Sequence, residues 1–140
     1  MRTVFADTSY WIAASDRKDS WAAVAASAED ALANTILITT DEILVEYLAA
    51  FSGAGPKARQ SSSSYVRRLF SRRDVSVVQQ SRESFLDGLS LYEARPDKGC
   101  SLTDCISMCT MRTRGIREVL TTDRHFAQEG FTVLMQRPVS

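Results

Sequence analysis

Residues 4–11 read VFADTSYW and take an apolar run directly into a polar turn, which is the pattern that decides the fold. The apolar run, Thr3 to Ala6, is short and is followed by polar residues, as is typical of a buried strand. Residues 9–14 and 21–32 are predicted helices, and the β-branched run from Ile36 to Thr39 is a predicted second strand. A strand, helices and another strand indicate a right-handed crossover between parallel strands. The beginning of the chain therefore predicts an α/β protein.

The rest of the chain continues this alternation of helices and strands. Helices are predicted over Asp41–Phe51, Ala58–Arg72, Arg82–Glu93, Leu102–Arg114 and Arg124–Gln128, and strands over Val75–Val78, Val119–Thr121 and Phe131–Met135. The segment Gly53-Ala54-Gly55-Pro56 separates the first two of these helices, which predicts a helical hairpin that protrudes from the sheet. No repeat and no second apolar core are visible, so residues 1–140 are expected to form one domain.

The overall composition excludes several classes of protein. The 17 basic and 17 acidic residues cancel, so the chain lacks the global positive field of a generic nucleic-acid coat protein. Fourteen of the basic residues are arginine, which suits bidentate phosphate recognition, although the base composition of the source organism explains the bias equally well. The three cysteines match neither a zinc site nor a disulfide framework. No segment has the length of a membrane span, and a cytoplasmic location is expected.

Four carboxylates lie where predicted strands are followed by predicted helices: Asp7, Glu46, Asp104 and Asp123. Their settings are VFADTSYW, TTDEILVEYL, CSLTDCISM and VLTTDRHF. In a parallel sheet these positions meet at the carboxyl edge, where open α/β folds build their sites. An acidic cluster there requires a hard divalent cation to neutralise it. It therefore predicts metal-assisted hydrolysis of a phosphodiester.

Each of these acids also has an ordinary structural explanation. Asp7 and Asp123 are in position to cap the helices that follow them, and Ser101-Leu102-Thr103-Asp104 matches a capping box. Taken singly, a capping role is the simpler interpretation for each aspartate. The common location of all four acids favours a shared site.

The choice between Glu42 and Glu46 rests on the helical wheel. Glu46 lies roughly 40° nearer to the apolar stripe of its helix, at about 100° per residue. Glu46 is therefore expected to border the core and Glu42 to face water. Glu42 has a structural role of its own, because Thr39-x-x-Glu42 also matches a capping box.

Other catalytic arrangements find little support in the sequence. His125 is the only histidine, and no Gly-x-Ser-x-Gly elbow or glycine-rich phosphate loop accompanies it. A phosphatase similar to the haloacid dehalogenases needs a second aspartate two residues after the first, where this chain has Ser9. A module that binds RNA or protein without cleaving it remains the second alternative.

Together, the four motifs resemble the PIN-domain family, and the short chain looks like the VapC-type toxins of prokaryotic toxin–antitoxin pairs. The resemblance implies a three-layer α/β/α fold around a parallel sheet of about four to five strands. It also implies an endoribonuclease that uses Mg²⁺ or Mn²⁺ and is the toxin of a type II pair. The metal site would consist of Asp7, Glu46, Asp104 and Asp123, with Asp97 as a weaker fifth candidate.

The resemblance further implies a homodimer and a small antitoxin that wraps the helical hairpin. Hydroxyl residues beside the acids are expected to support them: Thr8, Ser9, Ser101 and Thr122. On the hairpin, the residues expected to contact the partner or RNA are Tyr65, Arg68, Leu69 and Arg72. Substrate positioning near the sheet edge would involve arginines such as Arg17, Arg95 and Arg124, each of which is equally well explained as a solvated surface charge.

Overall fold

The computed structural model describes residues 1–137 and contains a parallel β-sheet. Along the sheet the strand order is β3-β2-β1-β4-β5, and every neighbouring pair is parallel. The strands are β1 (Arg2–Ala6), β2 (Thr35–Thr40), β3 (Val75–Val78), β4 (Glu118–Leu120) and β5 (Thr132–Val133). The predicted parallel α/β fold is thus confirmed.

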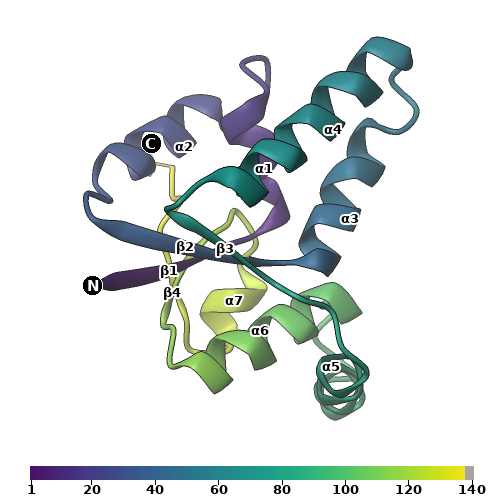
Figure 1. Ribbon diagram of the computed structural model, residues 1–140. Helices are drawn as coiled ribbons and strands as arrows, with labels where there is room; N and C mark the ends of the chain where they lie inside the picture. Colours follow the sequence, from purple (N-terminus) through teal and green to yellow (C-terminus); the bar gives the residue numbers. More distant parts are fainter. Residues whose placement is uncertain (138–140) are drawn as a thin grey trace.

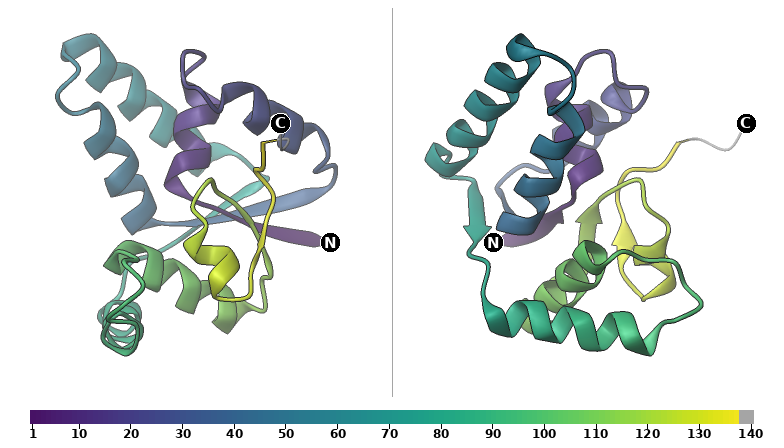
Figure 2. Two further views of the ribbon diagram at one scale, coloured as in Figure 1. Left: turned by 180° about the vertical axis from the view of Figure 1, so that it is seen from behind. Right: turned by 90° about the vertical axis from the view of Figure 1, so that its right-hand side faces the viewer.

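Helices cover both faces of this sheet (Figures 1 and 2). One face carries α1 (Thr8–Ser15), α2 (Ala22–Asp30), α3 (Asp41–Phe51) and α4 (Pro56–Ser71). The other face carries α5 (Arg82–Ala94), α6 (Leu102–Arg114) and α7 (His125–Gln128). The result is a three-layer α/β/α arrangement. Within residues 1–137, no helix has the length and apolar character needed to span a bilayer.

Strand β1 lies at the centre of the sheet and is buried on both sides. Val4, Phe5 and Ala6 have no exposed surface, as expected for a strand covered by helices on both faces. Trp11 of α1 packs fully buried above it and donates a hydrogen bond from Nε1 to Thr39 Oγ1 (3.2 Å). Thr39 in turn donates to the carbonyl of Ala6 (3.0 Å). This chain of bonds satisfies the buried polar groups and holds α1 at the end of β1.

The helices α3 and α4 form the predicted hairpin, which projects beyond the sheet (Figure 1). Gly55 has a φ of +99°, in the region that favours glycine, and Pro56 occupies the first turn of α4, where its missing N–H costs nothing. Tyr47 and Tyr65 stack between the two helices with ring centroids 5.6 Å apart. Leu69 is 1% exposed and belongs to the core. The prediction that its side chain contacts a partner is therefore wrong, because it faces inwards on α4.

Two local predictions at the start of α3 are also wrong. The helix is capped by Thr40, whose side chain accepts a hydrogen bond from the backbone N–H of Ile43 (3.2 Å), and not by Thr39. Thr39 is instead bonded to β1. Glu42 was expected to face water, but its Oε2 atom is buried and has no hydrogen-bond partner within residues 1–137. The capping residue lies one position later than the sequence pattern indicated.

Candidate functional site

The four acidic residues come from four different elements at the carboxyl edge of the sheet. Asp7 directly follows β1, and its N–H donates to the carbonyl of Leu120 at the end of β4 (3.0 Å). Asp123 follows β4, Glu46 lies on α3 after β2, and Asp104 lies in the first turn of α6. Their charges act on one another: Asp104 and Glu46 both raise the pKa of Asp7. The structure therefore brings the acids into one electrostatic cluster.

Asp7 is the buried member of this cluster. The residue is only 4% exposed. Its Oδ2 atom accepts a hydrogen bond from Thr121 Oγ1 (2.7 Å). Oδ1 is buried and has no hydrogen-bond partner among residues 1–137. Burial first, and the charges of Asp104 and Glu46 in addition, raise the pKa of Asp7 to about 7. A buried carboxylate with an unpaired oxygen is costly unless a cation compensates it.

Thr121 connects two of the acids and was not predicted. It is fully buried, donates to Asp7, and accepts a hydrogen bond from the N–H of Asp123 (3.0 Å). The sequence favoured Thr122 instead, but Thr122 contributes its backbone N–H, which donates to Ser9 Oγ (3.0 Å). The register of β1 and β4 pairs Ala6 with Leu120 and so places the next residues, Asp7 and Thr121, side by side. That pairing is visible only once the strands are aligned.

Glu46 is held by the predicted neighbour Thr8, whose hydroxyl donates to Glu46 Oε1. Thr8 lies in the first turn of α1, directly after Asp7, so the hydrogen bond joins α1 to α3 beside the cluster. The charge of Glu46 raises the pKa of both Asp7 and Asp104. Glu42, four residues earlier, is not among the principal causes of either shift. These contacts favour Glu46 as the glutamate of the site.

Asp104 is fixed by the predicted capping box at the start of α6. The N–H of Asp104 donates to Ser101 Oγ, and the N–H of Ser101 donates to Asp104 Oδ2, both at 3.1 Å. Burial raises the pKa of Asp104 to about 6, and the charges of Asp123 and Glu46 act in the same direction. The box leaves the second carboxylate oxygen outside this pair of bonds. Capping and a role in the cluster are therefore compatible.

Asp123 and His125 form the exposed side of the cluster. Asp123 Oδ1 accepts from the N–H of His125 (2.9 Å) and lies 2.7 Å from its Nδ1. Possible ligand atoms of Asp104, Asp123 and His125 all lie within 4.8 Å of one another. The sequence argued against histidine catalysis and gave His125 no role in the site. Its i+2 spacing from Asp123 was the available signal.

Asp97, the weaker candidate, does not share these features. Its side chain is 76% exposed, and its contact with Lys98 is a long ion pair of 4.0 Å. The group of close ligand atoms formed by Asp104, Asp123 and His125 includes neither Asp97 nor Asp7 and Glu46, but Asp7 and Glu46 are coupled to Asp104 through their charges, and Asp97 is not among the principal causes of the pKa shift of either Asp7 or Asp104. The structure gives Asp97 the environment of a surface charge.

The residues of the cluster suit a hard divalent cation. The donor set is made of carboxylate oxygens, which Mg²⁺ and Mn²⁺ prefer, with one imidazole at the edge. The Oδ1 atom of Asp7 has no hydrogen-bond partner among residues 1–137, and the raised pKa values of Asp7 and Asp104 mean that their surroundings disfavour the ionised forms, which a bound cation would favour. Asp7, Glu46, Asp104 and Asp123 could therefore hold such an ion between β1, β4, α3 and α6.

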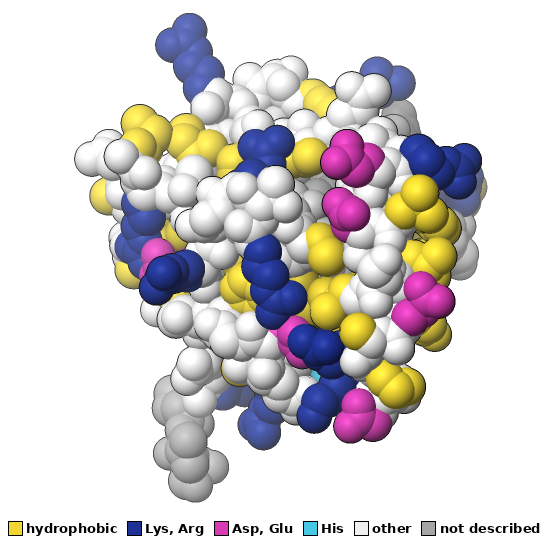
Figure 3. All heavy atoms as spheres, turned by 90° about the horizontal axis from the view of Figure 1, so that it is seen from below, with side chains coloured by type: hydrophobic (Ala, Val, Ile, Leu, Met, Phe, Trp, Pro, Cys, Tyr) yellow, Lys and Arg dark blue, Asp and Glu magenta, His cyan; other side chains and the backbone are white. Residues whose placement is uncertain are grey.

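The three arginines that were expected near this edge differ in their contacts and exposure. Arg95 is paired with Glu129 (2.8 Å), whereas Arg17 and Arg124 are exposed. Figure 3 shows the face formed by α5, α6 and α7, where basic, acidic and apolar side chains alternate without a continuous patch of one charge. The mixture of charges on this face agrees with the zero net charge of the chain.

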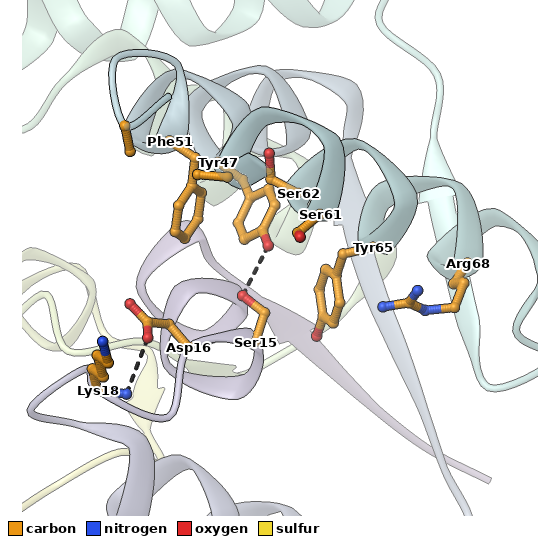
Figure 4. A pocket seen from close by; sticks show the side chains of 11 residues that line it. Ser15, Asp16, Lys18, Tyr47, Phe51, Ser61, Ser62, Tyr65 and Arg68 are labelled. Atoms are coloured by element: carbon orange, nitrogen blue, oxygen red, sulfur yellow. Dashed lines mark hydrogen bonds between the residues drawn. The ribbon is translucent and has the colours of Figure 1, made fainter. Parts of the chain in front are cut away.

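A separate cavity lies between the hairpin and the end of α1 (Figure 4). Its volume is about 450 Å³, and its walls include Tyr47, Phe51, Tyr65 and Arg68. The guanidinium of Arg68 lies over the ring of Tyr65, 5.7 Å from its centroid. Arg72 is less available than Arg68 to contact a partner, because it forms a bidentate ion pair with Asp74. None of the four carboxylates lines this cavity.

A parallel sheet with helices on both faces and an acidic cluster at its carboxyl edge defines an α/β protein with the kind of site that binds cations. The model of the PIN domain matches residues 4–131. The chain therefore belongs to the PIN domain family. No curated protein matches the sequence.

Two solved structures share the fold. VapC20 of Mycobacterium tuberculosis, a toxin that cleaves the sarcin-ricin loop, superposes with a TM-score of 0.83 at 18% identity, over 96% of this chain and 99% of the toxin chain. VapBC2 of Rickettsia felis, bound to a DNA fragment from its promoter, superposes with a TM-score of 0.65 at 13% identity, over 94% and 96% of the two chains. At these identities the likeness concerns the fold.

Proposed function

We propose that this PIN-domain protein is a metal-dependent endoribonuclease and the toxin of a type II toxin–antitoxin pair. The observation that carries the proposal is the cluster of four acids from four elements, in which Asp7 and Asp104 have raised pKa values. The match to the PIN domain supports a nuclease, and the fold likeness to a toxin that cleaves the sarcin-ricin loop supports RNA as the substrate class.

In this proposal Asp7 and Asp104 bind Mg²⁺ or Mn²⁺ directly. Glu46 and Asp123 complete the site, in part through water, because Mg²⁺ keeps several of its waters in proteins. When bound, the cation would activate a water for attack on phosphorus and offset the charge that develops on the phosphate oxygens. The exposed Asp97 has no part in this arrangement.

The protein's own residues orient the acids. Thr121 holds Oδ2 of Asp7, which leaves Oδ1 free for a cation. Thr8 fixes Glu46, and the capping box fixes one oxygen of Asp104. At neutral pH a cation would compete with protons for Asp7, whose pKa is about 7, and would favour the ionised form.

We also propose a small antitoxin, a homodimer and a cytoplasmic location. The cavity of the hairpin offers aromatic side chains and the partly free Arg68, which are groups enriched in protein interfaces. The fold likeness to a toxin–antitoxin complex supports this kind of partner. Coexpression with whatever small protein is encoded alongside is expected to give a stable complex, and failure to copurify would contradict the toxin assignment while leaving the nuclease intact.

Cleavage of RNA tests the enzymatic part directly. Purified protein is incubated with structured RNAs in Mg²⁺, in Mn²⁺ and in EDTA, and the wild type is compared with Asp7→Asn, Asp104→Asn and the control Asp97→Asn. We expect cleavage only with metal, a loss of at least about a hundredfold in the first two variants, and wild-type activity in the control. Activity in EDTA, or equal activity in all four proteins, would contradict the proposal.

A further inference from the structure

A second hollow lies next to the acidic cluster, between the end of α5 and the start of α6. Its volume is about 450 Å³, and its walls include Tyr92, Glu93, Arg95, Gly99 and Ser101. This volume is within the range of small-molecule sites in proteins. The hollow is therefore large enough for a planar aromatic ligand.

Two contacts join this hollow to the acidic cluster. Ser101 lines the hollow and donates its N–H to Asp104 Oδ2 (3.1 Å). Gly99 lies so close to His125 that a Cβ on this glycine would be 3.8 Å from Nε2, while Nδ1 of the same ring contacts Asp123. A ligand in the hollow would therefore lie beside any phosphate that reached the cluster.

The chemistry of the walls favours an uncharged ring over a second phosphate. Arg95 is already paired with Glu129 through two hydrogen bonds, at 2.8 and 3.3 Å. Glu93 places a negative charge at the same wall. Tyr92, in contrast, is 49% exposed although it is a large aromatic residue. Exposed aromatic rings beside a nucleic-acid channel are the usual stacking platforms for single-stranded bases.

We propose that this hollow is a base-binding subsite, in which Tyr92 stacks against a nucleobase of the RNA next to the cleaved phosphodiester. The proposal rests on the ribonuclease function proposed above. It makes Tyr92 a substrate-positioning residue that is independent of the metal ligands. Because every base has a π-face, stacking on Tyr92 alone would position the strand with little preference for one base.

The test compares RNA with and without bases. Binding of a short fluorescein-labelled oligoadenylate, and of an abasic ribose–phosphate strand of the same length, is measured by fluorescence anisotropy in the Asp7→Asn background. Into this background are introduced Tyr92→Ala, Tyr92→Phe and the control Leu86→Ala. Leu86 lies on the same helix, is 50% exposed and does not line the hollow. Thermal melting verifies that each variant is folded.

We expect Tyr92→Ala to bind oligoadenylate on the order of tenfold more weakly, since stacking on one aromatic ring contributes this much. The abasic strand should bind all variants equally, and Tyr92→Phe and Leu86→Ala should retain the parent affinity. Equal affinity of Tyr92→Ala for oligoadenylate, or an equal loss for the abasic strand, would overturn the subsite. Cleavage by the wild type is measured separately. A protein that binds as expected and cleaves nothing would refute the nuclease alone.

Discussion

The Asp7 carboxyl group combines burial, an unpaired oxygen and two neighbouring negative charges. Its pKa is about 7 in the folded protein, against about 3.9 in an unfolded chain. Between these values the folded state binds more protons than the unfolded state. The contribution of Asp7 to stability is therefore greatest at low pH and falls as the pH rises through this range.

Removal of the negative charge of Asp7 should stabilise the metal-free protein at high pH. In metal-free buffer, Asp7→Asn should raise the free energy of unfolding at pH 8 by roughly 1.4 kcal/mol for each unit by which the pKa is raised, as an upper limit. The amide can still accept the hydrogen bond from Thr121. Near pH 4 the variant and the wild type should be equally stable. Urea unfolding at both pH values measures the difference, and a variant that is less stable at pH 8 would contradict this account of Asp7.

Thr121 and the adjacent Thr122 provide a matched pair. The Thr121 hydroxyl bonds both Asp7 and the N–H of Asp123, so Thr121→Val should cost about 1–3 kcal/mol and reduce cleavage. Thr122 takes part through its backbone N–H, so Thr122→Val should be close to neutral. Equal effects of the two substitutions on thermal unfolding would show that the Thr121 hydroxyl has no special role.

The sequence predicted the acidic residues of the cluster better than it predicted the side chains that hold them in place by hydrogen bonds. Asp7 and Asp123 follow strands β1 and β4 as predicted, whereas Glu46 lies in the second turn of α3, and Asp104 lies in the first turn of a helix that follows helix α5 and not a strand. Ser101 contacts Asp104 as its capping box predicted, and the hydroxyl of Thr8 contacts Glu46, not its sequence neighbour Asp7. Thr121 could not be distinguished from Thr122, because the choice depends on the register between β1 and β4. Glu42 was misjudged, because a helical wheel does not include the tertiary contacts that bury one of its carboxylate oxygens.

Helix α6 carries a capping box whose acidic member is also in the cluster. Helix α5 carries a comparable box made by Ser81 and Ser84, which contains no acid. Ser101→Ala and Ser81→Ala should each cost about 0.5–2 kcal/mol of stability. Only Ser101→Ala should also weaken Mn²⁺ binding, since it loosens the turn that positions Asp104. Calorimetric titration with Mn²⁺ separates the two, and equal Mn²⁺ affinities would contradict the dual role of this cap.

The helices and strands themselves were well predicted where the local signals were strong. The bounds of α3, α6 and β3 agree with the apolar periodicity, with Gly115 ending α6 in the left-handed conformation. The cap of α3 was displaced by one residue, because Thr39 and Thr40 look alike in sequence and tertiary contacts decide between them. The last strand, Thr132–Val133, is shorter than its apolar run, whose outer residues Phe131 and Met135 are buried in the core.

For the whole molecule, the parallel sheet was predictable and the order of its strands was not. The alternation of elements implies parallel crossovers, but only the structure places β1 between β2 and β4. This order brings the ends of β1 and β4 together and creates the acidic cluster. The hollow beside Tyr92 depends on the packing of α5 against α6, which no local pattern reveals.

The central claim is that this cluster binds a divalent cation, and Mn²⁺ located by anomalous scattering tests it most directly. Crystals of the wild type and of Asp104→Asn are soaked in Mn²⁺, and anomalous difference maps are calculated at the manganese edge. We predict a peak in contact with the Asp7 and Asp104 carboxylates in the wild type, and its loss or clear weakening in the variant. Manganese bound only elsewhere on the wild-type protein, with Asp7 and Asp104 unliganded at saturating Mn²⁺, would contradict the account.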